Sequence, residues 1–234
     1  MAARTEGAAI GTQTACMDQP EERAAGAGVR RAEGLHGRRS ALLYSSCASV
    51  IAVTLARLLA APPDRSVLEE VARLTVCSPH DRLAAAVQRV AILALTADVD
   101  TIRDEYLRLF VQPSGALLLP WESTWTEIPP RLSGGPHADA LRFYARAGFV
   151  PKSASEPADH IATELTFVGI LAQRHRTEEL AEFWRAHVMP WMPAFARRLK
   201  RETREPLYVA VADLLLASAT PVPSVERQRE LRAR

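Results

Sequence analysis

The sequence is poor in several features that mark common classes of protein. It has three cysteines in 234 residues, Cys16, Cys47 and Cys77, which are odd in number and widely spaced. No Cys-x-x-Cys pair occurs, so neither a zinc ribbon nor a disulfide framework is predicted, and a reducing compartment fits best. Aromatic residues make up 6% of the chain. No segment alternates polar and apolar residues over any length, so no β-sheet is expected.

The chain also lacks a large excess of charge of one sign and a long apolar run. The net charge is +2 with mixed signs, so no broad basic face is expected and nucleic acid is not indicated as a partner. The apolar run from Ala41 to Ala56 is too short to span a bilayer. There is no Gly-rich phosphate loop after a strand and no Gly-x-Ser-x-Gly turn, which removes two common classes of enzyme site.

Helical periodicity is what the sequence does contain. Hydrophobic residues make up 48% of the chain, which is enough for one core, and they recur at intervals of three and four residues. We therefore expect an all-α single domain, a bundle of about eight to ten helices over residues 39–219. Residues 1–38 are expected to be a disordered extension, with an uncertain start site, and residues 220–234 a flexible charged tail.

Arg38-Arg39 followed by the apolar run could be a twin-arginine export signal on this chain itself. Arg57 interrupts the pattern, however, and no small-x-small cleavage site follows cleanly. A buried first helix that ends before Pro62-Pro63 is the favoured interpretation. The protein is then expected to stay in the cytoplasm.

Several helix ends and one long loop can be placed from local signals. Asp64 or Ser66 is expected to cap a short helix, and Gly148 to end the helix that begins near His137 with a left-handed residue. The Pro- and Gly-rich segment 112–136 cannot be one helix. It carries Trp121, and such a loop either packs over the core or offers a binding surface.

The segment from Ser155 to Phe167 resembles a helix start. Pro157 suits the first helical position, with Ser155 or Glu156 as the cap. Asp159 then lies in the first turn, where a negative charge is favoured by the helix dipole. We expect Asp159 at the surface, on the exposed end of this helix.

His160 and Glu164, beside the apolar stripe of the same helix, leave several interpretations open. They could be incidental polar residues, half of a metal site, or, with Asp159, the acid–base groups of a helical hydrolase. No second ligand pair at short spacing and no nucleophile accompanies them. We therefore predict no metal, no cofactor and no catalytic activity.

Four motifs in a fixed order carry a family resemblance over roughly residues 100–175. They are Asp104-Glu-Tyr-Leu-Arg-Leu-Phe110, Pro120-Trp-Glu-Ser123, Phe143-Tyr-x-x-Ala-Gly148 and Glu156-Pro-x-Asp-His-Ile-x-x-Glu-Leu-x-Phe167. Together they resemble the TorD/DmsD/NarJ family of cytoplasmic redox-enzyme maturation chaperones. The later region with His187, Trp191 and Tyr208 fits the family more loosely.

The resemblance implies a function and a site. It implies a TorD-like bundle that binds the twin-arginine signal peptide of a molybdopterin-dependent oxidoreductase catalytic subunit and assists cofactor insertion before export. Carboxylates can hold guanidinium groups through charge-assisted hydrogen bonds. The implied peptide-binding residues are Leu109 and Phe110 as a hydrophobic floor, then Pro120, Trp121, Glu122, Ser123, Glu156, Pro157, Asp159, His160 and Glu164.

Other properties stay open at this point. Some family members bind guanine nucleotide, but no feature of this sequence supports it. The chain could be a monomer or a domain-swapped dimer, and the client enzyme is not indicated. A helical scaffold or regulatory protein that binds a folded partner through the Trp121 loop is the alternative from another functional class.

Overall fold

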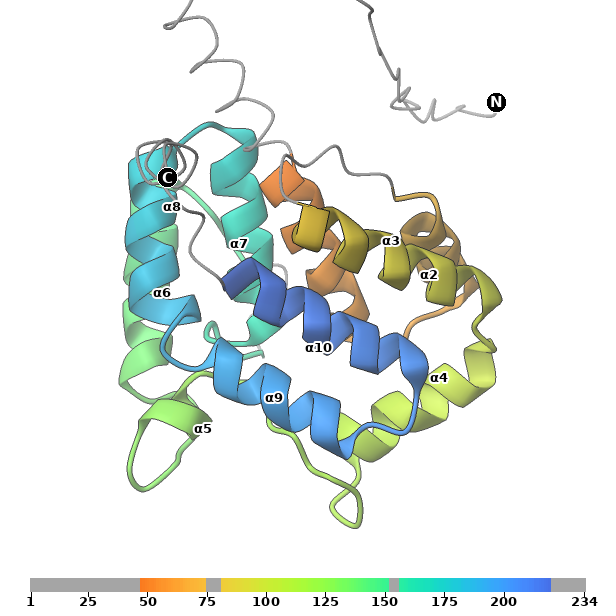
Figure 1. The fold of residues 1–234 in the computed structure, drawn as a ribbon. Helices are drawn as coiled ribbons and strands as arrows, with labels where there is room; N and C mark the ends of the chain where they lie inside the picture. The colour runs from red at the N-terminus through yellow and green to blue at the C-terminus, as the bar shows by residue number, and fades with distance from the viewer. Residues whose placement is uncertain (1–46, 75–80, 152–155, 220–234) are drawn as a thin grey trace, which may run out of the picture. The chain divides into compact units, whose positions relative to one another are not determined.

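Helices make up nearly all of the regular structure in the described part of the chain (Figure 1). The computed structural model describes residues 47–74, 81–151 and 156–219. Within these ranges the backbone forms no β-strand, so the all-α prediction is confirmed. The predicted extension 1–38 and tail 220–234 lie outside the described residues. After a helix over residues 47–60, the chain forms α2 (Arg65–Ala72), α3 (Asp81–Thr96), α4 (Val99–Tyr106), η1 (Leu107–Val111), α5 (Ser123–Thr126), α6 (Gly135–Ala147), α7 (Ile161–Gln173), α8 (Thr177–Phe183), η2 (Trp184–Val188), α9 (Met192–Glu202) and α10 (Pro206–Ala219).

The helix over residues 47–60 has one buried face, as expected for the predicted first helix. Leu55, Leu58 and Leu59 on that face are at most 1% exposed. Arg57 points away from it and pairs with Glu70 of α2. No helix among the described residues is long and apolar enough to cross a membrane.

Local capping chemistry explains several helix ends. Asp64 accepts a hydrogen bond from the Val67 amide at 2.9 Å, and Asp98 accepts one from the Thr101 amide at 2.9 Å. Each satisfies an amide that the first turn of the helix leaves without a partner. Gly148 ends α6 with φ of 66°, a left-handed conformation that costs glycine little. Both predicted ends, the cap at Asp64 and the stop at Gly148, are confirmed.

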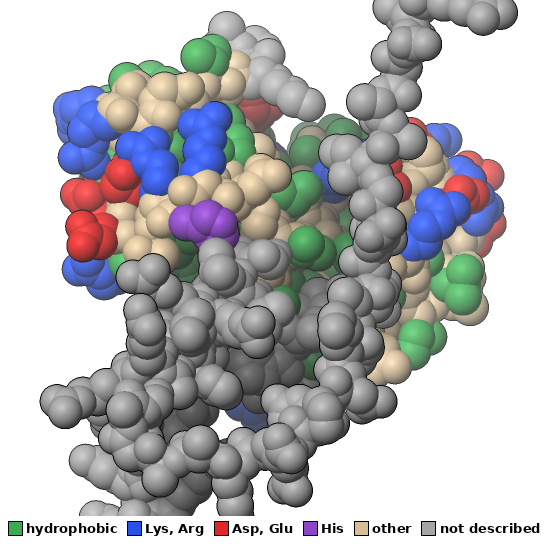
Figure 2. Space-filling model, turned by 90° about the horizontal axis from the view of Figure 1, so that it is seen from above, with side chains coloured by type: hydrophobic (Ala, Val, Ile, Leu, Met, Phe, Trp, Pro, Cys, Tyr) green, Lys and Arg blue, Asp and Glu red, His purple; other side chains and the backbone are tan. Residues whose placement is uncertain are grey.

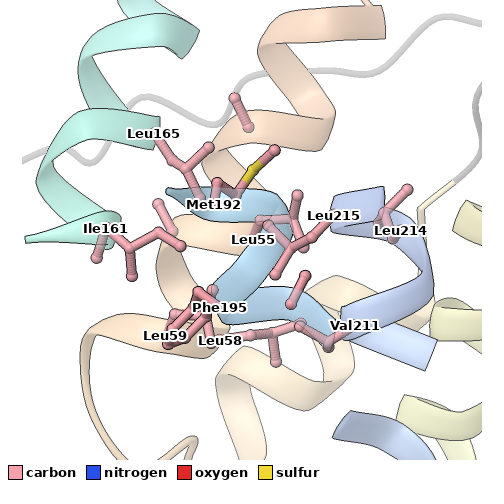
Figure 3. Close-up of a cluster of buried hydrophobic side chains, with 14 of the residues drawn as sticks. Leu55, Leu58, Leu59, Ile161, Leu165, Met192, Phe195, Val211, Leu214 and Leu215 are labelled. Carbon is pink, nitrogen blue, oxygen red and sulfur yellow. The ribbon is translucent and has the colours of Figure 1, made fainter. Parts of the chain in front are cut away.

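The core is built around α7 and α10. Nearly every position of α7 from Ile161 to Ala172 is buried, and α10 packs against α3 and α9. Figure 3 shows side chains from four helices meeting in this core: Leu55, Leu58, Leu59, Ile161, Leu165, Met192, Phe195, Val211, Leu214 and Leu215. Each such side chain contributes on the order of 1.5–3 kcal/mol by leaving water.

The start of α7 differs from the prediction. The helix begins at Ile161, with His160 as its cap, and not near Pro157. Asp159 therefore precedes the helix instead of occupying its first turn. The reason is tertiary: the Glu122 amide donates to the Asp159 carbonyl at 2.9 Å, and the Ile161 amide donates to the Pro120 carbonyl at 2.8 Å. These bonds hold His160 in an extended conformation. The residues before it form a turn, which the His160 amide closes by donating to the Pro157 carbonyl at 3.2 Å, so the local helix signal at Pro157 is overridden.

The segment between η1 and α6 is partly packed and partly exposed. Leu118 is fully buried, and its amide donates to the Leu109 carbonyl at 2.7 Å. Trp125 donates from its indole to the Leu119 carbonyl at 2.7 Å. The tip of the loop leaves Ile128 97% exposed. The part around Leu118 and Trp125 thus packs over the core, and the interpretation of the loop as a binding surface stays a prediction.

Candidate functional site

Two segments far apart in the sequence lie side by side at the candidate site. Residues 120–122 pair with residues 159–161 through an isolated antiparallel bridge between Trp121 and His160. The motifs predicted that the Trp121 loop and the residues around His160 form one site, and the structure brings these two segments together. The backbone hydrogen bonds on either side of the bridge fix their register.

The exposed part of this site is formed by Trp121 and Glu156. The Trp121 indole donates to Glu156 Oε1 at 2.8 Å, and its ring meets His160 edge-on with centroids 5.5 Å apart. Trp121 and Pro157 are half-buried, whereas Glu156 is exposed. An aromatic ring and a carboxylate therefore face solvent next to each other.

Asp159 is not at the surface, so that expectation is wrong. Its side chain is 0% exposed, and Oδ2 accepts a hydrogen bond from the Ser123 amide at 2.9 Å. The other oxygen, Oδ1, lies 4.0 Å from His137 Nδ1. Ser123 is also fully buried. Asp159 thus ties residues 120–123 to the segment that precedes α7.

His160 is a capping residue and is nearly buried. Its Nδ1 accepts a hydrogen bond from the Ala162 amide at 3.1 Å, which places the ring proton of the neutral form on Nε2. Burial lowers the pKa of His160, although Glu156 and Asp159 favour its charged form. A neutral imidazole at pH 7 follows.

A buried cluster of three residues lies beneath these segments. It consists of Glu122, Glu164 and His187, one ligand-type atom from each lying within 4.8 Å of the others. His187 Nδ1 is 2.8 Å from Glu122 Oε2, and the Trp191 indole donates to Glu164 Oε2 at 3.2 Å. Glu164 is 0% exposed, which corrects the expectation that it lies on the exposed end of its helix.

The electrostatics of the cluster follow from its burial. Desolvation raises the pKa of Glu122, and the hydrogen bond with His187 only partly offsets it. Desolvation also raises the pKa of Glu164 well above its ordinary value, and the neighbouring Glu122 carboxylate adds to this. Two carboxylates this close in a dry environment do not both carry a full charge without a compensating cation.

Leu109 and Phe110 lie in the core and form no exposed floor. Leu109 is 0% and Phe110 7% exposed. The Phe110 ring packs against those of Tyr106, Phe195 and Tyr208, with centroids 4.8, 6.3 and 6.1 Å away. These two residues support the chain that leads to residues 120–123, and in this conformation a peptide does not reach them.

Sequence reasoning missed His187 as a partner of the site and missed an apolar cavity. The motif resemblance was loose around His187, and 65 residues separate it from Glu122. The cavity, of about 480 Å³, is lined by the helix over residues 47–60 and by parts of α3, α7, α8, η2, α9 and α10. Ile51, Val168, Trp184 and Met192 are among its walls. Figure 2 looks onto one face of the molecule, where hydrophobic side chains lie in a hollow with charged groups toward both sides.

The described residues thus form a helical bundle in which Trp121 and Glu156 lie at an exposed edge, next to a buried cluster of two glutamates and a histidine. The sequence profile of the family described as "Nitrate reductase delta subunit" matches residues 78–197, half of the chain. The chain belongs to this family, to which the TorD/DmsD/NarJ chaperones are related. The resemblance predicted from the four motifs is confirmed.

Curated relatives point to the same class of protein. The chain is 28% identical over 133 residues to "Tat proofreading chaperone DmsD" of Salmonella typhi, covering 56% of this chain and 65% of that protein. It is 29% identical over 125 residues to "Chaperone protein TorD" of Vibrio parahaemolyticus, covering 48% and 58%. The matched segments thus span less than two thirds of either relative. Both relatives are named as chaperones and not as enzymes, in agreement with the predicted class.

A solved structure supports the fold. It is described as a redox enzyme maturation protein of Archaeoglobus fulgidus and superimposes with a TM-score of 0.53, covering 71% of this chain and 90% of the other. At 22% sequence identity, this likeness concerns the fold alone. It agrees with a TorD-like bundle.

Proposed function

We propose that this protein is a molecular chaperone that binds the twin-arginine leader of a molybdopterin-dependent oxidoreductase subunit. It holds the precursor in the cytoplasm until the cofactor is inserted, and it catalyses no reaction of its own. Membership of the family and the name of the Salmonella relative, a Tat proofreading chaperone, support this proposal.

The observation that carries the proposal is the pairing of residues 120–122 with residues 159–161. It puts the Trp121 indole and the Glu156 carboxylate 2.8 Å apart at an exposed edge. A guanidinium group can stack on an aromatic face and pair with a carboxylate at the same time. Pro120 and Pro157 stiffen the two sides of this edge because proline fixes φ.

The buried residues of the predicted site act by holding this edge in place. Asp159 and Ser123 join the two segments, and His160 caps α7. The residues with this supporting role are Leu109, Phe110, Glu122, Ser123, Asp159, His160 and Glu164.

The apolar run that follows the two arginines of a leader needs an apolar surface. The loop that continues from Trp121 exposes Ile128 and Leu132, 97% and 54% respectively. Burying about 500 Å² of apolar surface yields roughly 12 kcal/mol at ~25 cal/mol/Å². Ordering the peptide and association entropy take back several kcal/mol. The remainder, on the order of −7 to −9 kcal/mol, corresponds to micromolar or slightly tighter binding.

Calorimetric titration with a synthetic leader tests the proposal. Trp121→Ala and Glu156→Gln should each weaken binding by roughly 1–3 kcal/mol. Asp100→Asn removes a carboxylate whose side chain is 87% exposed on α4, and as a matched control it should change nothing.

A leader with both arginines replaced by glutamine completes a double-mutant cycle with Glu156→Gln. If the losses of binding free energy from the two changes are additive, Glu156 does not contact the arginines of the leader. No binding of the leader, combined with binding of a folded client that lacks it, would favour the scaffold alternative instead.

A further inference from the structure

The buried cluster of Glu122, Glu164 and His187 has the composition of a metal-binding site. The three residues come from different parts of the fold: Glu122 directly precedes α5, Glu164 lies in the first turn of α7, and His187 lies in the π-helical turn η2. One carboxylate or imidazole atom from each lies within 4.8 Å of the other two. π-helical turns within helices are frequent at functional sites.

One oxygen of Glu164 has no partner for its lone pairs. Glu164 is 0% exposed, and its Oε1 accepts no hydrogen bond from any described residue. Its other oxygen, Oε2, is occupied by the Trp191 indole at 3.2 Å. A buried oxygen left without a donor is costly, on the order of 1–3 kcal/mol. The Glu122 carboxyl is close enough to share a proton with Glu164, and a cation among the three residues would take the place of that proton.

His187 directs Nδ1 into the cluster, at 2.8 Å from Glu122 Oε2. Its Nε2 lies 3.3 Å from Asp139 Oδ2 of α6, which is an ion-pair distance without a hydrogen bond. Neutral imidazole nitrogens are common metal ligands. The ring is also held between Phe183, at 4.7 Å, and Phe143, at 5.1 Å.

We propose that Glu122, Glu164 and His187 bind one divalent first-row transition-metal ion, of the class of Zn²⁺, Mn²⁺ or Fe²⁺. Two carboxylates balance the charge of such an ion, and a mixed oxygen and nitrogen set suits it better than it suits Mg²⁺, which prefers oxygen and octahedral geometry. This site would contradict the prediction of no metal, which was based on the lack of a second pair of ligands close together in the sequence. The metal proposal does not depend on the proposed chaperone function.

The geometry needs only a small adjustment. Ligand atoms of a tetrahedral zinc site lie about 3.4 Å from one another, from bond lengths of about 2.1 Å. The observed separations run from 2.8 Å between His187 and Glu122 to no more than 4.8 Å within the set. Side-chain movements of roughly 1 Å bring all three atoms to that distance. Water would complete the coordination.

Zinc binding to the chelator-treated, full-length protein tests the inference. Equilibrium dialysis with elemental analysis should give one Zn²⁺ per chain, and Mg²⁺ should not compete. Co²⁺ should give visible absorption bands typical of low-symmetry nitrogen and oxygen coordination. Glu164→Gln, which keeps the size of the side chain, should weaken zinc binding at least 10-fold. His187→Gln, which removes the nitrogen ligand, should weaken it about 10-fold as well.

His175→Gln is the matched control, because His175 is an exposed histidine outside the cluster. It should leave zinc binding unchanged. Absence of stoichiometric zinc in the wild-type protein would overturn the inference and indicate that Glu122 and Glu164 share a proton instead. Equal binding by wild type and a folded Glu164→Gln variant, or loss of binding in His175→Gln, would place the ion elsewhere and also overturn it.

Discussion

Replacing Glu105 by alanine should lower the free energy of unfolding more than replacing an exposed carboxylate by alanine. Glu105 is 6% exposed and accepts two hydrogen bonds from Arg108, each of 2.7 Å. It also accepts from the Thr203 hydroxyl at 2.9 Å and the Arg204 amide at 2.6 Å. Thr203 and Arg204 lie between α9 and α10, 98 and 99 residues further along the chain. One carboxylate thus joins α4 to the link between the last two helices.

The size of the effect follows from what the substitution leaves behind. Alanine removes every acceptor and leaves the Arg108 guanidinium, whose side chain is 19% exposed, without its partner. Breaking a buried ion pair costs about 3–5 kcal/mol. Arg108 keeps a 2.7 Å bond to the Glu202 carbonyl, so we expect the lower end, about 3 kcal/mol. Glutamine retains an acceptor and should cost about 1–2 kcal/mol.

Urea unfolding followed by tryptophan fluorescence measures this loss. Glu69→Ala is the control, because Glu69 forms an ion pair with Arg73 at 3.4 Å and its side chain is 53% exposed. Such surface pairs contribute less than about 1 kcal/mol. If Glu105→Ala costs no more than Glu69→Ala, the argument from burial is wrong.

The same carboxylate predicts a pH dependence. Burial opposes ionisation of Glu105, but hydrogen bonds from Arg108, Arg204 and Thr203 outweigh it and lower its pKa below the ordinary value of 4.5. A lowered pKa stabilises the fold above pH 4.5 and loses this contribution as the pH falls through the lowered pKa. The stability difference between wild type and Glu105→Gln should therefore shrink below pH 4.5. A difference that stays constant there would contradict the assignment.

Three further substitutions test separate features. Gly148→Ala should lower the free energy of unfolding by about 1 kcal/mol, measured by thermal melting, because φ is 66°; an unchanged melting temperature would contradict this. Gly169→Ala would place a Cβ 2.8 Å from Val53 Cγ2 and should lower the free energy of unfolding, measured in urea, by about 1 kcal/mol. Adding Val53→Ala to this variant should restore most of the lost stability, because it removes the clashing methyl group. Asp159→Asn should cost about 1–2 kcal/mol of stability by weakening the bond to the Ser123 amide. A loss of leader affinity with unchanged stability would instead show that Asp159 contacts the peptide.

Local sequence signals predicted the helical class and some helix ends, because these depend on neighbouring residues. Gly148 stops α6 and Asp64 caps α2 as expected. Pro157 and Asp159 also satisfied local rules for a helix start, yet α7 begins at Ile161. Hydrogen bonds with residues 120–123 decide that position, and no local rule contains them.

The candidate site was predicted in part for the same reason. The motifs indicated that Trp121 and His160 belong together, and they form a bridge. Helical periodicity placed Glu164 beside the apolar stripe and therefore at the surface, whereas the buried part of α7 extends beyond that stripe and includes Glu164. The contact of Glu122 with His187 joins residues 65 apart, a separation at which spacing alone carries no information.

The central place of α10 has a consequence for the synthesis of the protein. The ribosome makes residues 47–60 early, but the buried face of this helix packs with side chains of α10, such as Leu214 and Leu215 (Figure 3). Until residues 206–219 have emerged, Leu55 and its neighbours lack part of their final environment. Domains fold as units during translation, so this bundle closes late. Until then, the nascent chain exposes the apolar face of residues 47–60 to solvent.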